Sequence, residues 1–92
     1  MALPALAYPV PFRLERLGRG RLRLVNRSDE TLTGVVFLLD GPGVMAARPA
    51  GSLRPGARAE LRVLGDDLAR ATAVVVRWSR PNGEGYLWRI SF

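Results

Sequence analysis

The groups in this chain that could do chemistry are its carboxylates, its hydroxyls and its arginines. The 92 residues contain no histidine, no cysteine and no lysine. The usual general base near neutral pH, the thiol nucleophile and the Schiff-base amine are therefore all missing. No imidazole is present to activate the serines, which are Ser28, Ser52, Ser79 and Ser91. We expect a protein that is not an enzyme.

Two pairs of adjacent acids stand at expected turns, and these are Asp29-Glu30 and Asp66-Asp67. Carboxylate oxygens suit calcium, but a calcium site takes about five or more oxygens from a spaced pattern of ligands. Turn formation and helix capping are the favoured roles for these acids. The runs "GPG" (41–43) and "RPG" (54–56) also mark turns, because neither opens a helix as a phosphate loop would. We expect no metal and no cofactor.

The net charge is +6, and every basic residue is an arginine. The many Ala, Gly, Pro, Val and Leu residues beside them are typical of GC-rich codon usage, so the arginine excess is weak support for a nucleic-acid partner. No apolar run reaches the roughly 18–20 residues that span a bilayer. The apolar start lacks basic residues and is interrupted by Pro4, Pro9 and Pro11, unlike a secretory signal. We expect a cytoplasmic protein without a membrane span, in which an extended arm (1–11) precedes one domain (12–92).

The elements that must position these groups are short strands, separated by turns at intervals of about 8–12 residues. Residues 57–63 show the pattern best, because apolar and charged side chains alternate there after a turn at Pro55-Gly56. One short helical turn is expected within 66–73, with Asp66 as its N-cap. The predicted strands are 12–17, 20–26, 31–39, a short irregular edge strand at 44–49, 57–64, 72–79 and 85–92.

The last hairpin, "WSRPNGEGY" (78–86), allows two registers. A two-residue turn at Asn82-Gly83 would mix apolar and charged side chains on each face. A three-residue loop (81–83) makes one face wholly apolar, and it fits a type I turn that is begun by proline and followed by a left-handed glycine. We predict this second register, in which the pairs are Trp78 with Tyr86, Val76 with Trp88, Val74 with Ile90 and Arg80 with Glu84.

The stretches "RLRLVNRSDETLTGVVFLLDG" and "SLRPGARAELRV" resemble bacterial immunoglobulin-like or fibronectin-III-like modules, such as cell-adhesion-related bacterial β-sandwich domains. In these modules a strand ends in Asn before a polar turn, and a Leu-x-Pro-Gly turn opens an alternating strand. Asn26, Leu53, Pro55 and Gly56 match that pattern over about half of the chain. The resemblance implies an immunoglobulin-like fold, so we predict an all-β, seven-strand antiparallel sandwich.

In this topology, strands 31–39, 72–79 and 85–92 share one sheet. Strand 31–39 is apolar on both faces, with Leu32, Val36 and Leu38 expected on the outer one. The aromatic residues of this sheet could form a ligand site, but their even spacing favours core packing. An apolar patch on an outer sheet face marks an interface unless the arm or the segment near Val44-Met45 folds over it. The predicted interface consists of Val36, Leu38, Val75 and Leu87, with Arg77 and Arg89 at its rim.

Strands 12–17, 20–26 and 57–64 share the other sheet in this topology, and their outward positions form a basic face. A basic face can hold an acidic partner or phosphates, but a solvated surface is the favoured interpretation. No aromatic residue alternates with its arginines to stack bases. The candidate polyanion-binding residues are Arg13, Arg21, Arg23, Arg58 and Arg62.

The sequence therefore predicts a non-catalytic interaction or assembly module that binds a protein partner, another copy of itself included, through the apolar face. The alternative is binding of nucleic acid or another polyanion on the basic face. Salt distinguishes the two, because phosphate binding weakens steeply with salt whereas an apolar interface survives.

Overall fold

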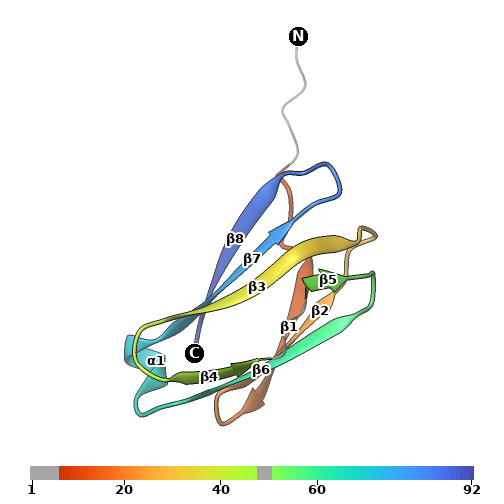
Figure 1. Ribbon diagram of the computed structural model, residues 1–92. Coiled ribbons are helices and arrows are strands. Elements are labelled where there is room, and N and C mark those ends of the chain that lie inside the picture. The colour runs from red at the N-terminus through yellow and green to blue at the C-terminus, as the bar shows by residue number, and fades with distance from the viewer. Residues whose placement is uncertain (1–6, 48–50) are drawn as a thin grey trace.

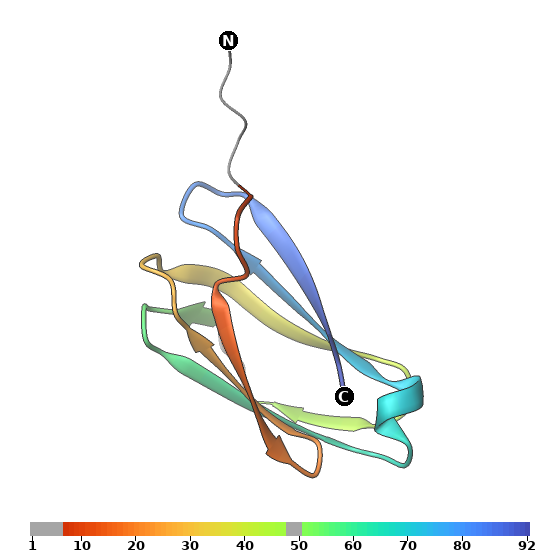
Figure 2. The same ribbon diagram turned by 180° about the vertical axis from the view of Figure 1, so that it is seen from behind.

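The computed structural model describes residues 7–47 and 51–92, and the chain there is almost entirely β-structure. Two antiparallel sheets of four strands pack face to face, and the helical turn α1 (Leu68–Ala71) lies at one end (Figures 1 and 2). The strands are β1 (Phe12–Gly18), β2 (Arg21–Asn26), β3 (Leu32–Asp40), β4 (Val44–Ala47), β5 (Gly51–Leu53), β6 (Arg58–Leu64), β7 (Ala73–Ser79) and β8 (Gly85–Ser91).

The strand order confirms the predicted immunoglobulin-like sandwich. One sheet has the order β1-β2-β6-β4, and the other has the order β5-β3-β7-β8. The first sheet and the β3-β7-β8 part of the second correspond to the two halves of an immunoglobulin fold. The predicted grouping of the strands into two sheets is therefore correct.

The count of seven strands is wrong by one, because the structure has an additional strand, β5, among its described residues. Residues 44–47 pair with the end of β6, whereas Gly51 and Leu53 pair with the beginning of β3. One run of chain thus supplies an edge to each sheet. The strand predicted at 44–49 is β4, and its last two residues lie outside the described residues.

The expectation that Leu32 lies on the outer face of its strand is also wrong. Leu32 is fully buried, and so is Val35 three residues later. The register of β3 against β7 shifts between Thr33 and Val36, and Gly34 has a φ of +58° within that shift. The shift is a bulge that adds one residue to β3, and a glycine accommodates its left-handed backbone. The extra residue reverses the alternation, so the Leu32 side chain points into the core.

The short helix differs from its prediction in position and in cap. It spans Leu68–Ala71, and its N-cap is Asp67 rather than Asp66. Asp67 is in the left-handed conformation with a φ of 57°, and its side chain makes no capping hydrogen bond. Among residues 7–47 and 51–92, no helix is long and apolar enough to cross a membrane.

The core lies between the two sheets and is formed by the inward side of each strand. On β6, for example, the alternation is complete, with Ala59, Leu61 and Val63 buried and their neighbours exposed. Trp78 is the largest core side chain and meets the ring of Phe12 edge-on at 5.1 Å. The predicted packing role of the aromatic residues is confirmed for Trp78 and Phe37, which are both buried.

The β7–β8 hairpin has the predicted register. Trp78 pairs with Tyr86, Val76 with Trp88 and Val74 with Ile90. The Arg80 backbone N–H donates to the Glu84 carbonyl at 2.8 Å, and the Gly83 N–H donates to the Arg80 carbonyl at 2.9 Å. Gly83 has a φ of +90°, as a left-handed loop position requires.

Residues 7–11 run along one end of the sandwich before β1 begins (Figure 2). The ring of Tyr8 lies 4.5 Å from the ring of Tyr86, centroid to centroid. Its hydroxyl accepts a hydrogen bond from the Trp78 indole Nε1 at 3.3 Å. The guanidinium of Arg80 covers the Tyr8 ring at 4.2 Å and also binds the carboxylate of Glu30. Residues 1–6 of the predicted arm lie outside the described residues.

Candidate functional site

The outer face of β3, β7 and β8 carries the apolar residues that the sequence singles out, and we call it the β3–β7–β8 patch: Val36, Leu38, Val75 and Leu87. The strand register arranges the side chains of this face in rows. One row reads Val36, Arg77, Leu87, and the next reads Leu38, Val75, Arg89. The residues of the patch and Arg77 line one open hollow on this face. The structure thus places all six predicted interface residues on one outer surface.

Three of the four side chains of the patch are exposed, and the fourth, Val75, is half-buried. Leu87 is 66% exposed, Val36 is 47% exposed and Leu38 is 44% exposed. Single exposed apolar residues are ordinary. A group of them on one sheet face is hydrated at a cost in free energy, and burial against a partner would remove that cost. Complete burial of a Val or Leu side chain from full exposure gains about 1.5–3 kcal/mol, so burial of the exposed part of each of these side chains gains roughly half of that.

The two arginines of this face have different surroundings. Arg89 forms an ion pair with Asp40, which lies in the next row on the far side of β7. The Arg89–Asp40 pair therefore bounds the patch at one end. Arg77 forms no ion pair with another described residue. It lies on the middle strand between Val36 and Leu87, whereas the sequence interpretation put it at the rim.

The described parts of the two segments that the sequence offered as covers lie elsewhere. Residues 7–11 reach the inward-facing residues Trp78 and Tyr86 through Tyr8. Val44 and Met45 belong to β4, which pairs with β6 in the opposite sheet. Within the part of the chain that the structure describes, the patch therefore keeps its exposure.

Asp40 is the residue of this face that sequence reasoning did not single out. It directly follows the predicted strand 31–39 and precedes the turn at 41–43. The sequence did contain a sign of this ion pair, because Asp40 on β3 and Arg89 on β8 have opposite charge. Their closeness depends on the register between β3 and β7, which adjoining sequence does not determine.

The basic face lies on the outer side of β1, β2 and β6, as predicted. Two of its five arginines are held by acids of the same face. Arg23 binds Glu60 at 2.8 Å and Glu15 at 3.1 Å, and Arg13 binds Glu15 at 3.1 Å. The Arg13 and Arg23 hydrogen bonds lower the pKa of the Glu15 carboxyl, and the Glu60 hydrogen bond raises the pKa of Arg23. These pairings reduce the charge that the face can offer to phosphates.

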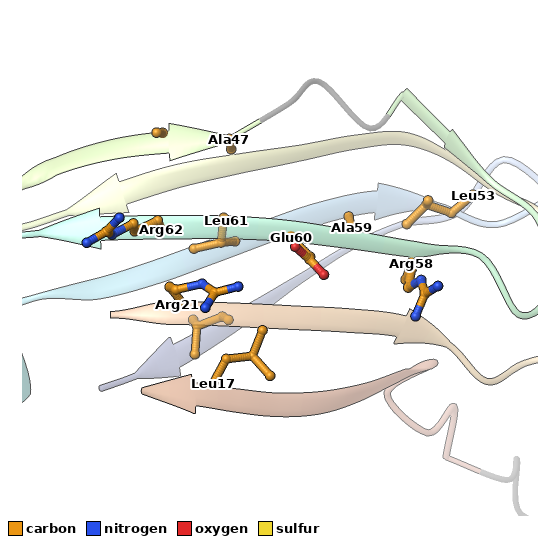
Figure 3. Close-up of a pocket in the computed structure, with 11 residues that line it drawn as sticks. Leu17, Arg21, Ala47, Leu53, Arg58, Ala59, Glu60, Leu61 and Arg62 are labelled. Carbon is orange, nitrogen blue, oxygen red and sulfur yellow. The ribbon is translucent and has the colours of Figure 1, made fainter. Parts of the chain in front are cut away.

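The other three arginines of the basic face line a second hollow, which Figure 3 shows. Arg21 and Arg62 are direct cross-strand neighbours, and Arg58 lies farther along β6 beyond Glu60. Two like charges opposite each other on neighbouring strands repel, so an anion bound between the two guanidinium groups would reduce that repulsion. Glu60 lies between Arg58 and Arg62 along the strand, however, and it opposes an anionic ligand.

The chain is similar to the yeast GGA1 GAE domain, with 16% identity and a TM-score of 0.48, over 88% of this chain and 86% of that chain. It is also similar to the GAE domain of GGA2p from Saccharomyces cerevisiae, with 17% identity and a TM-score of 0.44, over 96% of each chain. No family model matches the chain, and neither does any curated protein.

At these TM-scores the likeness carries no inference about the site. The all-β, immunoglobulin-like assignment depends on the strand order alone. The comparisons give no support to the bacterial and fibronectin-III parts of the resemblance seen in the sequence.

Proposed function

We propose that this chain is a non-catalytic protein-interaction module that binds a protein partner through the β3–β7–β8 patch. The observation that carries the proposal is the exposure of Val36, Leu38 and Leu87 together on one outer sheet face. The sequence contains no histidine, cysteine or lysine, so the usual general base near neutral pH, the thiol nucleophile and the Schiff-base amine are absent.

The proposed mechanism combines burial of apolar area with one specific polar contact. A partner that covers the row Val36, Arg77, Leu87 also takes the Arg77 guanidinium out of water. A desolvated guanidinium needs acceptors, and a carboxylate on the partner would supply them through charge-assisted hydrogen bonds. Arg89 already has such an acceptor in Asp40 and would contribute from the edge of the interface.

The test compares two arginine substitutions at exposed leucines. Leu38→Arg puts a charge within the patch, whereas Leu64→Arg makes the same chemical change on β6 in the other sheet. Leu64 is 53% exposed and Leu38 is 44% exposed, so both variants should fold. We expect a partner isolated with the wild-type chain to bind Leu64→Arg equally well and Leu38→Arg at least about tenfold more weakly, a loss of about 1.4 kcal/mol.

Calorimetric titration of the isolated partner provides the measurement. Burial of apolar area gives a negative heat-capacity change on binding, and the affinity should change little between moderate and high salt. Equal affinity of Leu38→Arg and the wild type would overturn the proposal. An affinity that falls steeply with salt and is lost in Arg21→Ala and Arg62→Ala would assign binding to the basic face instead.

A further inference from the structure

We propose that a second copy of this chain pairs with β8 edge to edge, so that two four-stranded sheets join into one continuous sheet. This surface is the backbone edge of β8 and not the β3–β7–β8 patch. The proposal is therefore independent of the function proposed above. Figure 1 shows β8 as the last strand of its sheet, with β7 on one side.

Among the four edge strands of the sandwich, β8 is the one best suited to pairing. The strands β4 and β5 have four and three residues. The strand β1 has seven residues, but its register shifts near its end, and it carries the charged run Arg13, Glu15 and Arg16. The strand β8 also has seven residues, pairs with β7 without any shift, and contains no proline. The only charged residue of β8 is Arg89, and a long regular edge with few charges and no bulge invites another strand.

The backbone groups that β8 directs outward follow from the hairpin loop. The Arg80 N–H donates to the Glu84 carbonyl, which makes residues 80 and 84 a hydrogen-bonded pair. Hydrogen-bonded and non-hydrogen-bonded pairs alternate in an antiparallel ladder. Residues 86, 88 and 90 therefore direct their backbone groups toward β7. Residues 85, 87, 89 and 91 direct theirs to the free edge.

One side-chain hydrogen bond supports this assignment. The Ser91 carbonyl accepts a hydrogen bond from the Arg16 guanidinium at 2.7 Å, so this carbonyl points away from β7. No other hydrogen bond from the described residues reaches the outward groups of β8. A carbonyl has two acceptor positions, so the Arg16 contact does not prevent pairing at Ser91.

The sequence of β8 selects one two-fold register. Pairing centred on Trp88 places Leu87 opposite Arg89 of the second copy and uses all seven residues of the strand. The four outward positions then pair with each other, which allows about eight backbone hydrogen bonds. A shift toward the chain end would put Arg89 opposite itself, and like charges directly opposite are destabilising. A shift the other way, centred on Leu87, would shorten the ladder.

The inner side of the edge also gains from pairing. Tyr86 and Trp88 are only partly buried, although both face the space between the sheets. The Trp88 ring stacks on Phe12 with centroids 6.4 Å apart. A second β8 strand would place Trp88 beside its own copy and Tyr86 beside Ile90. Aromatic side chains paired across strands contribute to sheet stability.

Two single-cysteine variants test this register directly, because the chain has no cysteine of its own. Leu87→Cys and Arg89→Cys replace exposed side chains and should leave the fold unchanged, which circular dichroism checks. In the proposed register, residue 87 of one copy lies opposite residue 89 of the other, within the separation a disulfide bridges. Residue 87 lies too far from residue 87 of the second copy for a disulfide to form. The same holds for residue 89 and residue 89 of the second copy.

We expect an equimolar mixture of the two variants to form a disulfide-linked dimer under mild oxidation, and each variant alone to stay largely uncrosslinked. A non-reducing gel measures this result. Efficient crosslinking of either variant alone would overturn the register, because it would place identical residues opposite each other. The absence of crosslinked dimer in the mixture at high protein concentration would overturn the pairing itself.

Light scattering on a sizing column gives a second readout with a matched pair of variants. Arg89→Pro removes an outward N–H without removing a hydrogen bond to β7, whereas Arg89→Ala removes the same side chain and keeps the N–H. We expect twice the chain mass for the wild type and for Arg89→Ala, and one chain mass for Arg89→Pro. A dimer that survives Arg89→Pro but dissociates in Leu38→Arg would assign self-association to the patch and overturn the proposal.

Discussion

At the scale of single residues, Asn26 connects more of the molecule than any other buried polar side chain. Its Nδ2 donates to the carbonyls of Glu30 and Leu53 at 2.8 and 3.0 Å, and its Oδ1 accepts from the Ser28 N–H and hydroxyl. Its backbone also bonds with Ala57 and Gly56. One amide thus joins the loop after β2, the strand β5 and the turn before β6.

We expect Asn26→Ala to lower the free energy of unfolding by about 2–4 kcal/mol, because it removes the side-chain donor from the buried Leu53 carbonyl and the acceptor from the Ser28 hydroxyl. Urea denaturation followed by circular dichroism measures the loss. Asn82→Ala is the control, since Asn82 makes two comparable side-chain hydrogen bonds to Glu84 in an exposed turn. The control should lose less than about 1 kcal/mol. Similar losses in the two variants would show that burial of the Asn26 network contributes little.

The sequence marked Asn26 only through a resemblance, as a strand-ending residue before a polar turn. Its partners come from positions 4 and 27 residues away, and nothing in the local pattern specifies them. Arg80 shows the same limit. The sequence predicted its pairing with Glu84, which is present at 3.8 Å, but its closer partner is Glu30 at 3.1 Å. Charge pattern predicts a nearby partner and misses one that only the fold brings close.

At the scale of elements, two glycines in the left-handed region stand where β1 turns into β2, Gly18 as the last residue of β1 and Gly20 within the turn, and their surroundings differ. Gly18 has a φ of +85° and open space where a Cβ would be. Gly20 has a φ of +73°, and a Cβ there would lie 2.1 Å from the Val63 carbonyl oxygen. The Gly20 carbonyl also accepts the Val63 N–H at 2.9 Å, so the two backbones are held together.

We expect Gly18→Ala to cost about 1–2 kcal/mol for the positive φ alone. Gly20→Ala should cost about 1–3 kcal/mol more, since a backbone carbonyl must move. Thermal unfolding of the two variants measures the difference. Equal losses of stability in the two variants would contradict this expectation. They would show that the β1–β2 turn can move away from β6 without cost, although the Val63 N–H is hydrogen-bonded to the Gly20 carbonyl.

The elements also show where sequence patterns suffice. The β7–β8 hairpin was predictable in register, because its turn residues and the match of its two faces are both local. The outer position of Val36 and Leu38 followed from alternation in the same way. The bulge at Gly34 was not predictable, since a glycine within an apolar run has several explanations. The central place of Arg77 in the patch depends on pairing with β3, which is distant in sequence, and on that bulge.

At the scale of the whole molecule, a sandwich of two sheets has exposed strand edges, exposed outer faces and open ends. The described part of this chain covers only some of these surfaces. Residues 7–11 run along the end where Trp78 and Tyr86 would otherwise meet water. The patch on one outer face and the edge of β8 keep their exposure among the described residues. These two surfaces adjoin at Leu87, so a dimer joined at β8 would place two patches side by side on one sheet face. A partner with two binding segments could then engage both copies.

Tyr8 closes that end of the sandwich, and the contacts of its ring can be separated from the contact of its hydroxyl. Tyr8→Ala removes the ring from Tyr86 and from Arg80 and the hydroxyl from the Trp78 indole. We expect it to lower the free energy of unfolding by about 1–3 kcal/mol and to shift tryptophan emission to longer wavelength as Trp78 meets water. Tyr8→Phe keeps the ring and loses one hydrogen bond, so it should lose only about 0.5–1.5 kcal/mol with little shift. Chemical denaturation followed by fluorescence measures both variants. If Tyr8→Ala were as stable as the wild type and its emission unchanged, residues 7–11 would contribute nothing to the closure, and the sandwich would be complete from β1 onward.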